Sequence, residues 1–294
     1  MFKRIFCALA LSASTLQAAE IDTYVGKENV SEVPTKVAVL DIAALDTLAA
    51  LGVQLAGVPE NVYVDYLSDV TAGVPTIGNI FEPDFEAVNA LAPDLIVVGG
   101  RSSTHMRAMS DMAQTIDMTI WEDTVGQGLD RLEAYGAIFG KESEAEALAE
   151  AFTQKLALAK TALDGKGTAL VVLTNGPKIS AYGAGGRFGW LHEKLGLEEA
   201  VKDVEQTTHG EAISFEFIKE ANPDILIVVD RLAAIGRPGE SAATTLDNPL
   251  VAETTAWKNG NVVYLNAADI YISGGGIQSM NRTLDVILSV FAAG

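Results

Sequence analysis

Short apolar segments alternate along this chain with segments whose apolar residues recur at helical spacing. A continuous apolar run over 37–40 precedes an amphipathic stretch over 43–51, and a second apolar run covers 95–98. In the second half of the chain, the apolar run over 169–173 is followed by a helical pattern from about Phe188. Alternation of strands and helices predicts an α/β fold with largely parallel sheets.

One long helical segment lies between the two halves of this pattern. Residues 142–164 are rich in Ala, Leu, Glu and Lys, their apolar residues lie near helical spacing, and the Asp-Gly-Lys-Gly sequence at 164–167 ends the segment. We therefore predict an N-terminal lobe over 35–140 and a C-terminal lobe over 168–290, joined by this connecting helix. The periodicity alone fits an ordinary crossover helix equally well.

An internal repeat supports the two-lobe interpretation. Residues 86–101 recur as residues 216–231, with glutamate, Pro-Asp and arginine at the same offsets. Each copy predicts a short helix that begins at its glutamate, a Pro-Asp turn, a buried strand and an arginine just past the carboxyl end of that strand. Because one copy lies on each side of the long helix, we expect two pseudo-equivalent lobes. A ligand is expected in the cleft between them.

The first nineteen residues have the pattern of a secretory signal peptide. Lys3 and Arg4 precede an apolar run over 5–11, and small residues ending at Ala19 follow before the first acidic side chain. The only cysteine, Cys7, lies inside the apolar run, whereas a lipid-anchored cysteine would follow it. We expect an exported chain without a lipid anchor and, after cleavage, without a disulfide or thiolate metal site.

The strongly negative net charge argues against anionic macromolecules as binding partners. The chain carries a formal charge of −19, and the predicted signal peptide holds two of its few positive charges. Nucleic acid is therefore not expected as a partner. An anionic ligand would need a local concentration of positive charge, so the positions of the arginines matter.

The motifs of common enzymes are absent from the sequence. It contains no Gly-x-Ser-x-Gly elbow, no Walker-type Gly-Lys-Ser/Thr and no His-Glu-x-x-His, and its glycine cluster over 183–189 lacks nucleotide-loop spacing. The three histidines are too scattered for a dedicated zinc site. One of them, His209, lies in a predicted loop over 207–211 before the second repeat. Most histidines in loops bind no ligand and catalyse no reaction, so the position of His209 alone is weak evidence for a functional role.

Tyr271 stands between a predicted strand near 262–265 and the last helix, and Gly274-Gly-Gly276 follows it closely. Three glycines are expected to let the backbone turn sharply and approach a ligand. A buried tyrosine is the commoner meaning of such a residue, but a phenolate can also bind a hard trivalent ion.

Together these features resemble the iron-siderophore periplasmic binding proteins of the type-III (cobalamin and iron-siderophore) class, most closely the CeuE and FatB branch that binds catecholate siderophores. The resemblance rests on the signal peptide, the long helix, the doubled Glu to Pro-Asp pattern, Arg187-Phe-Gly, the His209-Gly loop, Val-Asp-Arg231 and Tyr271 with its glycines. It implies a fold of two βα-rich lobes joined by a single long helix.

The resemblance also implies roles for individual residues. Arg101, Arg187 and Arg231 match arginines that form a positive floor under an anionic ferric catecholate, and two of them are equivalent in the repeat. His209 and Tyr271 match the pair that completes the coordination of Fe(III) when the siderophore supplies only four donors. The iron arrives as a siderophore complex, with no intrinsic cofactor.

Glu86 and Glu216 match glutamates on the lobe surfaces that dock onto the permease of an ABC importer in the inner membrane. The expected protein is thus a monomeric, periplasmic carrier without enzymatic activity. No residue-level match to the family is identified for the loop over 232–240, Trp121 or Trp190. Such regions often shape ligand specificity in this family, so the resemblance does not identify the siderophore. A haem or cobalamin carrier of the same class is the alternative, and a metal-dependent enzyme or chelatase is a more distant one.

Overall fold

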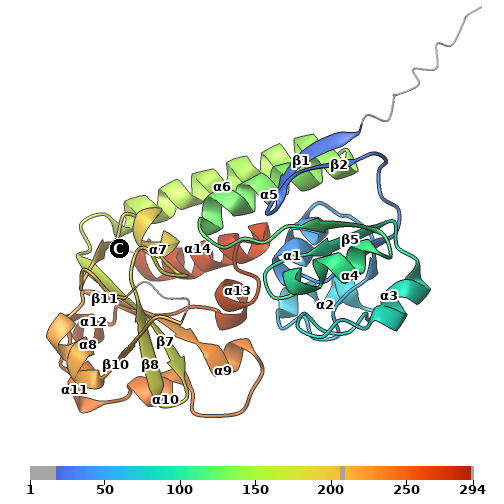
Figure 1. The fold of residues 1–294 in the computed structure, drawn as a ribbon. Coiled ribbons are helices and arrows are strands. Elements are labelled where there is room, and N and C mark those ends of the chain that lie inside the picture. Colours follow the sequence, from blue (N-terminus) through green and yellow to red (C-terminus); the bar gives the residue numbers. More distant parts are fainter. Residues whose placement is uncertain (1–17, 206–208, 293–294) are drawn as a thin grey trace, which may run out of the picture.

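The computed structural model describes residues 18–205 and 209–292, so nearly all of the predicted signal peptide lies outside the described residues. Two lobes stand side by side, each built on its own sheet, and the long helix α6 (Glu142–Leu163) runs along both of them (Figure 1). This confirms the predicted α/β architecture of two lobes. Among the described residues, no helix is both long and apolar enough to cross a membrane.

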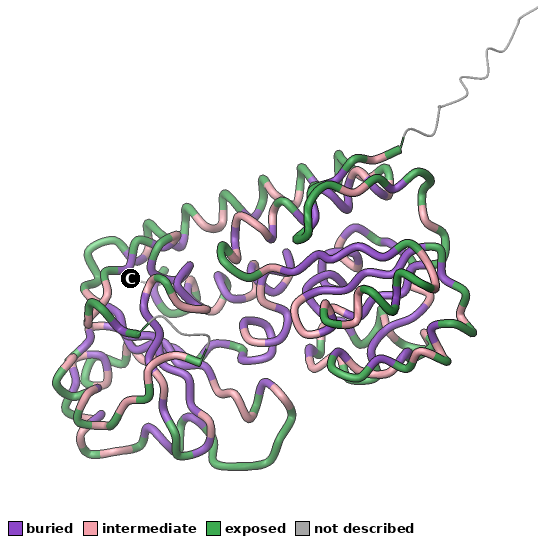
Figure 2. The backbone as a smooth tube through the Cα atoms, in the orientation of Figure 1, coloured by how far each residue is buried: buried purple, intermediate pink, exposed green. Residues whose placement is uncertain are grey.

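The N-terminal lobe contains a four-stranded parallel sheet with strand order β4-β3-β5-β6. Its strands are β3 (Val37–Val39), β4 (Leu55–Gly57), β5 (Leu95–Val98) and β6 (Gln114–Asp117). The central strands β3 and β5 are wholly buried, as the purple segments of Figure 2 show. Burial on both faces explains why they are continuous apolar runs.

The C-terminal lobe contains a mixed sheet with strand order β10-β8-β7-β11-β12, and β9 pairs with β7. Its strands are β7 (Thr168–Asn175), β8 (Lys178–Tyr182), β9 (Glu198–Glu199), β10 (Glu211–Ile213), β11 (Ile225–Asp230) and β12 (Val262–Tyr264). β7, β11 and β12 are parallel to one another, whereas β8 pairs antiparallel with both of its neighbours, β7 and β10. The largely parallel sheet that the sequence predicts is therefore only partly present in this lobe.

The antiparallel direction of β8 is the main feature of this lobe that the sequence pattern did not predict. After β7 the chain turns back at Asn175-Gly176, where Gly176 has a φ of +59° that favours glycine. The predicted helix near Phe188 exists, but only as α7 (Trp190–Glu193). Lys178 and Ser180 alternate with apolar residues in β8, so this strand is not a continuous apolar run.

Both copies of the repeat have the predicted structure. α3 (Phe85–Leu91) precedes β5, and α8 (Phe215–Ala221) precedes β11. In one copy the Asp94 carboxylate accepts hydrogen bonds from the Thr35 and Lys36 amides at 2.8 and 2.9 Å. In the other, the Asp224 carboxylate accepts one from the Thr168 amide at 2.9 Å. The repeated Pro-Asp therefore fastens each helix-to-strand turn to the start of the neighbouring strand.

The connection between the lobes is wider than a single helix. α6 packs against α5 (Thr124–Phe139) and against the last helix, α14 (Ile277–Phe291). α14 also packs against α1 (Ile42–Ala50) of the N-terminal lobe. A hairpin of β1 (Ala19–Thr23) and β2 (Gly26–Val30), which the sequence pattern did not predict, covers α5.

The remaining helices of the described residues are short. They are η1 (Asp65–Leu67), α2 (Ser68–Thr71), η2 (Ser103–His105) and α4 (Met106–Ser110) in the N-terminal lobe, and α9 (Arg231–Ala234), α10 (Ala242–Leu246), α11 (Pro249–Ala252), α12 (Thr255–Asn259) and α13 (Ala267–Tyr271) in the C-terminal lobe.

Candidate functional site

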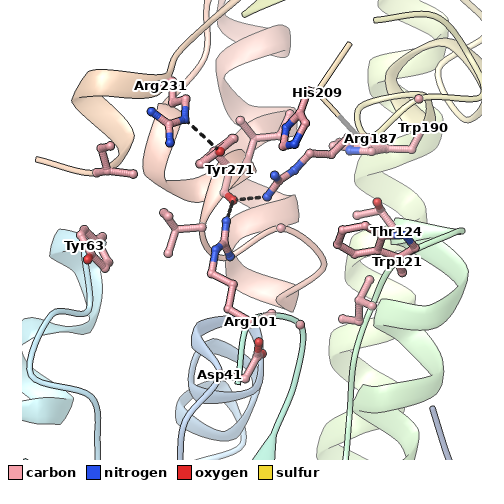
Figure 3. Close-up of a pocket in the computed structure, with 18 of the residues that line it drawn as sticks. Asp41, Tyr63, Arg101, Trp121, Thr124, Arg187, Trp190, His209, Arg231 and Tyr271 are labelled. Atoms are coloured by element: carbon pink, nitrogen blue, oxygen red, sulfur yellow. Dashed lines mark hydrogen bonds between the residues drawn. The ribbon is translucent and has the colours of Figure 1, made fainter. Parts of the chain in front are cut away.

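A cavity of about 650 Å³ lies between the two lobes. Both lobes contribute side chains to its walls, and Figure 3 shows them facing one another across the cleft. The polar and aromatic residues among them are Asp41, Tyr63, Phe81, Arg101, Trp121, Glu122 and Thr124 from the N-terminal half of the chain and Arg187, Trp190, His209, Arg231, Arg237 and Tyr271 from the C-terminal half.

The three predicted arginines converge on Tyr271. Arg101 Nη2 and Arg187 Nη2 donate to the Tyr271 carbonyl oxygen at 3.3 and 2.5 Å, and Arg231 Nε donates to its phenolic oxygen at 3.2 Å. The guanidinium carbon of Arg187 lies 4.1 Å from the centroid of the Tyr271 ring, within cation–π range. The structure thus brings together residues that are 170 positions apart in the sequence.

Local structure explains where the two repeated arginines lie. Arg231 begins α9 directly after β11, and Asp230 caps that helix by accepting from the Ala233 amide. Arg101 follows β5 in a loop that Gly100 fixes, because the Gly100 amide donates to Thr119 Oγ1 at 2.8 Å. Both arginines therefore project beyond the carboxyl ends of parallel strands, where α/β folds bind ligands.

The positive charge of this cluster has no carboxylate partner within ion-pair distance among the described residues. Besides the Tyr271 hydroxyl, Arg231 donates to the amide oxygen of Asn175, at 3.3 Å. Burial, followed by the charge of Arg101, lowers the pKa of Arg187. Guanidinium groups remain charged even so. The cleft therefore presents three arginines without an ion-pair partner in the described part of the chain, although Asp41 and Glu122 also line it.

The phenol of Tyr271 is shifted toward ionisation. Burial raises its pKa, but the hydrogen bond from Arg231 and the charges of Arg187, Arg231 and Arg101 outweigh burial, so the pKa lies below the ordinary value. A phenolate is a hard anionic oxygen donor of the kind that ferric iron prefers. The Tyr271 phenolate could therefore bind a metal cation. Because three arginines surround it, that cation would have to arrive in a complex with net negative charge.

His209 reaches the cleft from the turn before β10 and is exposed. It lines the main cavity and also a smaller one of about 300 Å³, which it shares with Arg231 and Tyr271. Figure 3 shows His209 and Tyr271 facing the same part of the cleft. Residues 207 and 208 of the predicted His209 loop lie outside the described residues. Within 18–205 and 209–292, no three His, Cys, Asp or Glu side chains are grouped to hold a metal ion.

Glu86 and Glu216 lie far from the cleft. Each is exposed in the first turn of its helix, behind the capping residues Asp84 and Ser214. Their helices, α3 and α8, lie at opposite outer ends of the molecule (Figure 1). The two glutamates therefore form a matched pair, one on each lobe.

Several cleft residues were missed or left without a role by the sequence analysis. Trp121 is 53% exposed and Trp190 is 5% exposed, yet both line the cavity, as do Arg237 and Tyr63. Phe81 is also exposed, and the Arg101 guanidinium lies 5.8 Å from its ring centroid. Their large aromatic rings were the signal for the tryptophans, Tyr63 and Phe81, whereas Arg237 offered only a positive charge in the loop over 232–240.

The glycines after Tyr271 have the predicted role only in part. Only Gly274 lines the cavity. A Cβ atom on Gly275 would lie 2.7 Å from Ile120 Cδ1, and one on Gly276 would lie 2.6 Å from Asp46 Cγ. These two glycines therefore permit close packing against the N-terminal lobe, whereas the sequence analysis assigned the whole triplet to ligand approach.

Comparison with known proteins extends over both lobes. A family described as periplasmic binding protein matches residues 37–268. The petrobactin-binding protein YclQ of Bacillus subtilis is 36% identical, over 85% of this chain and 80% of the relative. The ferric-anguibactin-binding protein FatB of Vibrio anguillarum is 31% identical, over 91% and 86%. The crystal structure of the periplasmic catecholate-siderophore binding protein VctP of Vibrio cholerae superposes with a TM-score of 0.86 at 30% identity, over 92% and 99%.

Proposed function

Because the chain belongs to the periplasmic binding protein family, we propose that it binds a ferric siderophore of the catecholate type between its lobes and delivers it to an ABC importer. The chain is accordingly a binding protein and not an enzyme, and its two lobes with one long connecting helix are the type-III fold of such proteins. Its relatives support the ligand class, since three of them are described as binders of petrobactin, ferric anguibactin and a catecholate siderophore.

The observation that carries this proposal is the convergence of Arg101, Arg187 and Arg231 on Tyr271 without a carboxylate partner among the described residues. A ferric catecholate complex carries net negative charge on hard oxygen atoms. Guanidinium groups donate charge-assisted hydrogen bonds to such oxygens. In an otherwise acidic protein, the three arginines create a local region of positive electrostatic potential that attracts an anionic complex.

His209 and Tyr271 are proposed to bind the iron directly when the siderophore leaves two coordination positions open. The lowered pKa of Tyr271 and the shared cavity of the two side chains support this role. For a siderophore that already supplies six donors, the arginines alone are proposed to hold the complex.

Glu86 and Glu216 are proposed to dock the loaded protein onto the permease, one lobe to each subunit. Their exposure on equivalent helices at the two outer ends of the molecule supports this role. The protein acts outside the cytoplasm, as the periplasmic binding protein VctP does. We further propose that it is a monomer released into the periplasm without a lipid anchor, because Cys7 lies within the apolar run of the predicted signal peptide.

Parallel titrations of intrinsic fluorescence test the ligand class. Trp121 and Trp190 line the cavity and should report its occupancy. Ferric catecholate should quench the fluorescence at one equivalent and give a broad visible band, whereas ferric hydroxamate, haem and cobalamin should bind far more weakly. Tight binding of haem with a Soret band, or of cobalamin, would replace the proposal by a carrier of that cofactor.

A further inference from the structure

The last helix, α14, is capped by the opposite lobe. Its first three amide groups donate across the lobe boundary: Ile277 N to Thr47 Oγ1 at 3.2 Å, Gln278 N to Asp46 Oδ1 at 2.8 Å and Ser279 N to Asp46 Oδ2 at 2.9 Å. No side chain of the segment before α14 caps it. Helix amides need such acceptors when they are buried. Residues of α1 therefore satisfy the N-terminus of a helix that belongs, by sequence, to the C-terminal lobe.

Asp46 is the centre of a wider buried network. It is 0% exposed, it also accepts a hydrogen bond from the Tyr66 hydroxyl, and its carbonyl oxygen accepts from Gln278 Nε2 at 2.8 Å. Ser273 Oγ donates to the Ile42 carbonyl oxygen at 3.4 Å and lies 3.3 Å from the Tyr66 hydroxyl. The hydrogen bonds that join Asp46, Thr47 and Tyr66 to residues 273–279 are called the Asp46 junction below.

The backbone of Gly275 and Gly276, between the cleft and α14, packs closely against the N-terminal lobe at the Asp46 junction. Gly276 has no room for a Cβ beside Asp46, and Gly275, with a φ of +92°, has none beside Ile120. On the other side, a Cβ on Gly128 of α5 would lie 2.5 Å from the Gly275 carbonyl oxygen. Close packing of backbone on both sides leaves this segment little freedom.

Tyr271 lies two residues before Ser273, at the end of α13. Its backbone carbonyl oxygen accepts from Arg101 of the N-terminal lobe and from Arg187 of the C-terminal lobe. Tyr271 is thus followed closely by residues 273–279, which are hydrogen-bonded to the N-terminal lobe, although α13 itself packs within the C-terminal lobe. The position of Tyr271 depends on this segment.

We propose that Asp46 is a positioning residue, which holds Tyr271 in register with Arg101 across the lobe boundary. Asp46 does not line the cleft and acts only through residues 273–279. The inference rests on the proposed function, because it needs Tyr271 to act as an iron ligand. It goes further by placing the determinant of that ligand's geometry outside the binding site.

The substitution Asp46→Asn tests the proposal with little change in volume. One carboxylate oxygen becomes an NH₂ group, so an amide at the start of α14 or the Tyr66 hydroxyl loses its acceptor. Asp94→Asn is the matched control, because Asp94 also accepts from two backbone amides and a hydroxyl, all within the N-terminal lobe. Thr47→Val is a milder second variant, which removes only the acceptor of Ile277 N.

Each variant is titrated with a tetradentate and with a hexadentate ferric catecholate, and the visible charge-transfer band of the tetradentate complex is recorded. Asp46→Asn should weaken tetradentate binding by about tenfold, as expected for one lost buried hydrogen bond. It should change hexadentate binding much less and shift the band toward that of Tyr271→Phe. Thr47→Val should give the same pattern on a smaller scale, and Asp94→Asn should alter neither affinity nor band.

Equal losses for both complexes, or an unshifted band with Asp46→Asn and Thr47→Val, would overturn the positioning role while leaving the proposed function intact. If Tyr271→Phe itself changes neither the tetradentate affinity nor the band, then the ligand role of Tyr271 fails and the positioning role fails with it. The Tyr271→Phe titration therefore separates the two failures.

Discussion

Two tyrosines beside the cleft show how strongly direct contacts decide ionisation. Tyr182 and Tyr271 line the same smaller cavity. Burial raises the pKa of Tyr182, and the charges of Arg187 and Arg231 do not reverse this. The pKa of Tyr271 is lowered instead, because Arg231 donates a hydrogen bond to its hydroxyl and three arginines surround it. Only Tyr271 is thereby prepared to act as a phenolate.

Removing the proposed iron ligands should affect siderophores according to their denticity. Tyr271→Phe and His209→Ala should weaken a tetradentate ferric complex strongly, because two coordination positions are then left without protein donors. A hexadentate complex is already saturated and should bind almost as before. Fluorescence titration with both complexes measures the difference, and Tyr182→Phe is the control. Equal losses for both complexes with Tyr271→Phe would assign the residue to packing and end its role as a ligand.

At the level of single residues, the sequence revealed the site where a pattern repeated. Arg101 and Arg231 could be predicted because the repeat places each just past a buried strand. Tyr63 and Trp121 could not, since their approach to the cleft depends on how loops of different elements fold together. Asp46 did leave a signal, an acidic residue within an apolar helical stretch, but its partner lies more than two hundred residues away.

Among the elements, α3 and α8 are the equivalent pair that the repeat predicts, and their glutamates are expected to act together. Glu86→Lys and Glu216→Lys should each abolish uptake in vesicles that contain the permease, because a reversed charge repels the partner's cations. Ligand affinity should stay unchanged, since neither residue lines the cleft. Glu220→Lys, on the same helix as Glu216, serves as the charge-matched control. Undiminished transport by both variants would leave the glutamates only as acids at helix N-termini.

The junction between α1 and α14 should make stability depend on pH. Burial raises the pKa of Asp46 to about 7, against the hydrogen bonds from Tyr66, Gln278 and Ser279, and the charge of Asp269 adds to the rise. A folded pKa above the unfolded value means that the folded state holds this proton more tightly. The contribution of this group is therefore complete below about pH 4 and is lost as the pH rises through about 7.

Thermal unfolding of the wild type and of Asp46→Asn between pH 4 and pH 8 checks this sign. The melting temperature of the wild type should fall relative to that of the variant as the pH rises, because the amide does not titrate. A difference that stays constant over the range, or one that grows in favour of the wild type at high pH, would contradict a raised pKa.

The sequence pattern predicted the strands that are buried along their whole length, and it was less informative for strands that are only partly buried. β5 and β11 are apolar throughout and could be located by their runs. β8 mixes exposed, half-buried and buried residues over only five positions, and β10 has no fully buried residue. Short, partly exposed strands depend on their neighbours in the sheet more than on their own sequence.

Over the whole molecule, the lobes are held together by more than the helix that the sequence predicted. α6 and α14 both pack along the boundary, and the Asp46 junction adds buried hydrogen bonds across it. Two packed helices resist bending more than a strand hinge would. Closure on the ligand should therefore be small. Small-angle scattering of the apo and loaded protein tests this, and a change of several ångströms in the radius of gyration would contradict it.

The account depends above all on the positive charge of the cleft, and an arginine series titrated with ferric catecholate tests it most directly. Replacing Arg101, Arg187 or Arg231 singly by Gln should cost about 1 to 3 kcal/mol of binding free energy for tetradentate and hexadentate complexes alike, as expected for one charge-assisted hydrogen bond. Arg107→Gln, outside the cleft, should cost nothing. Removing all three should abolish binding of the anionic complex while the protein still unfolds cooperatively. Binding of ferric catecholate by the triple variant with wild-type affinity would contradict the account.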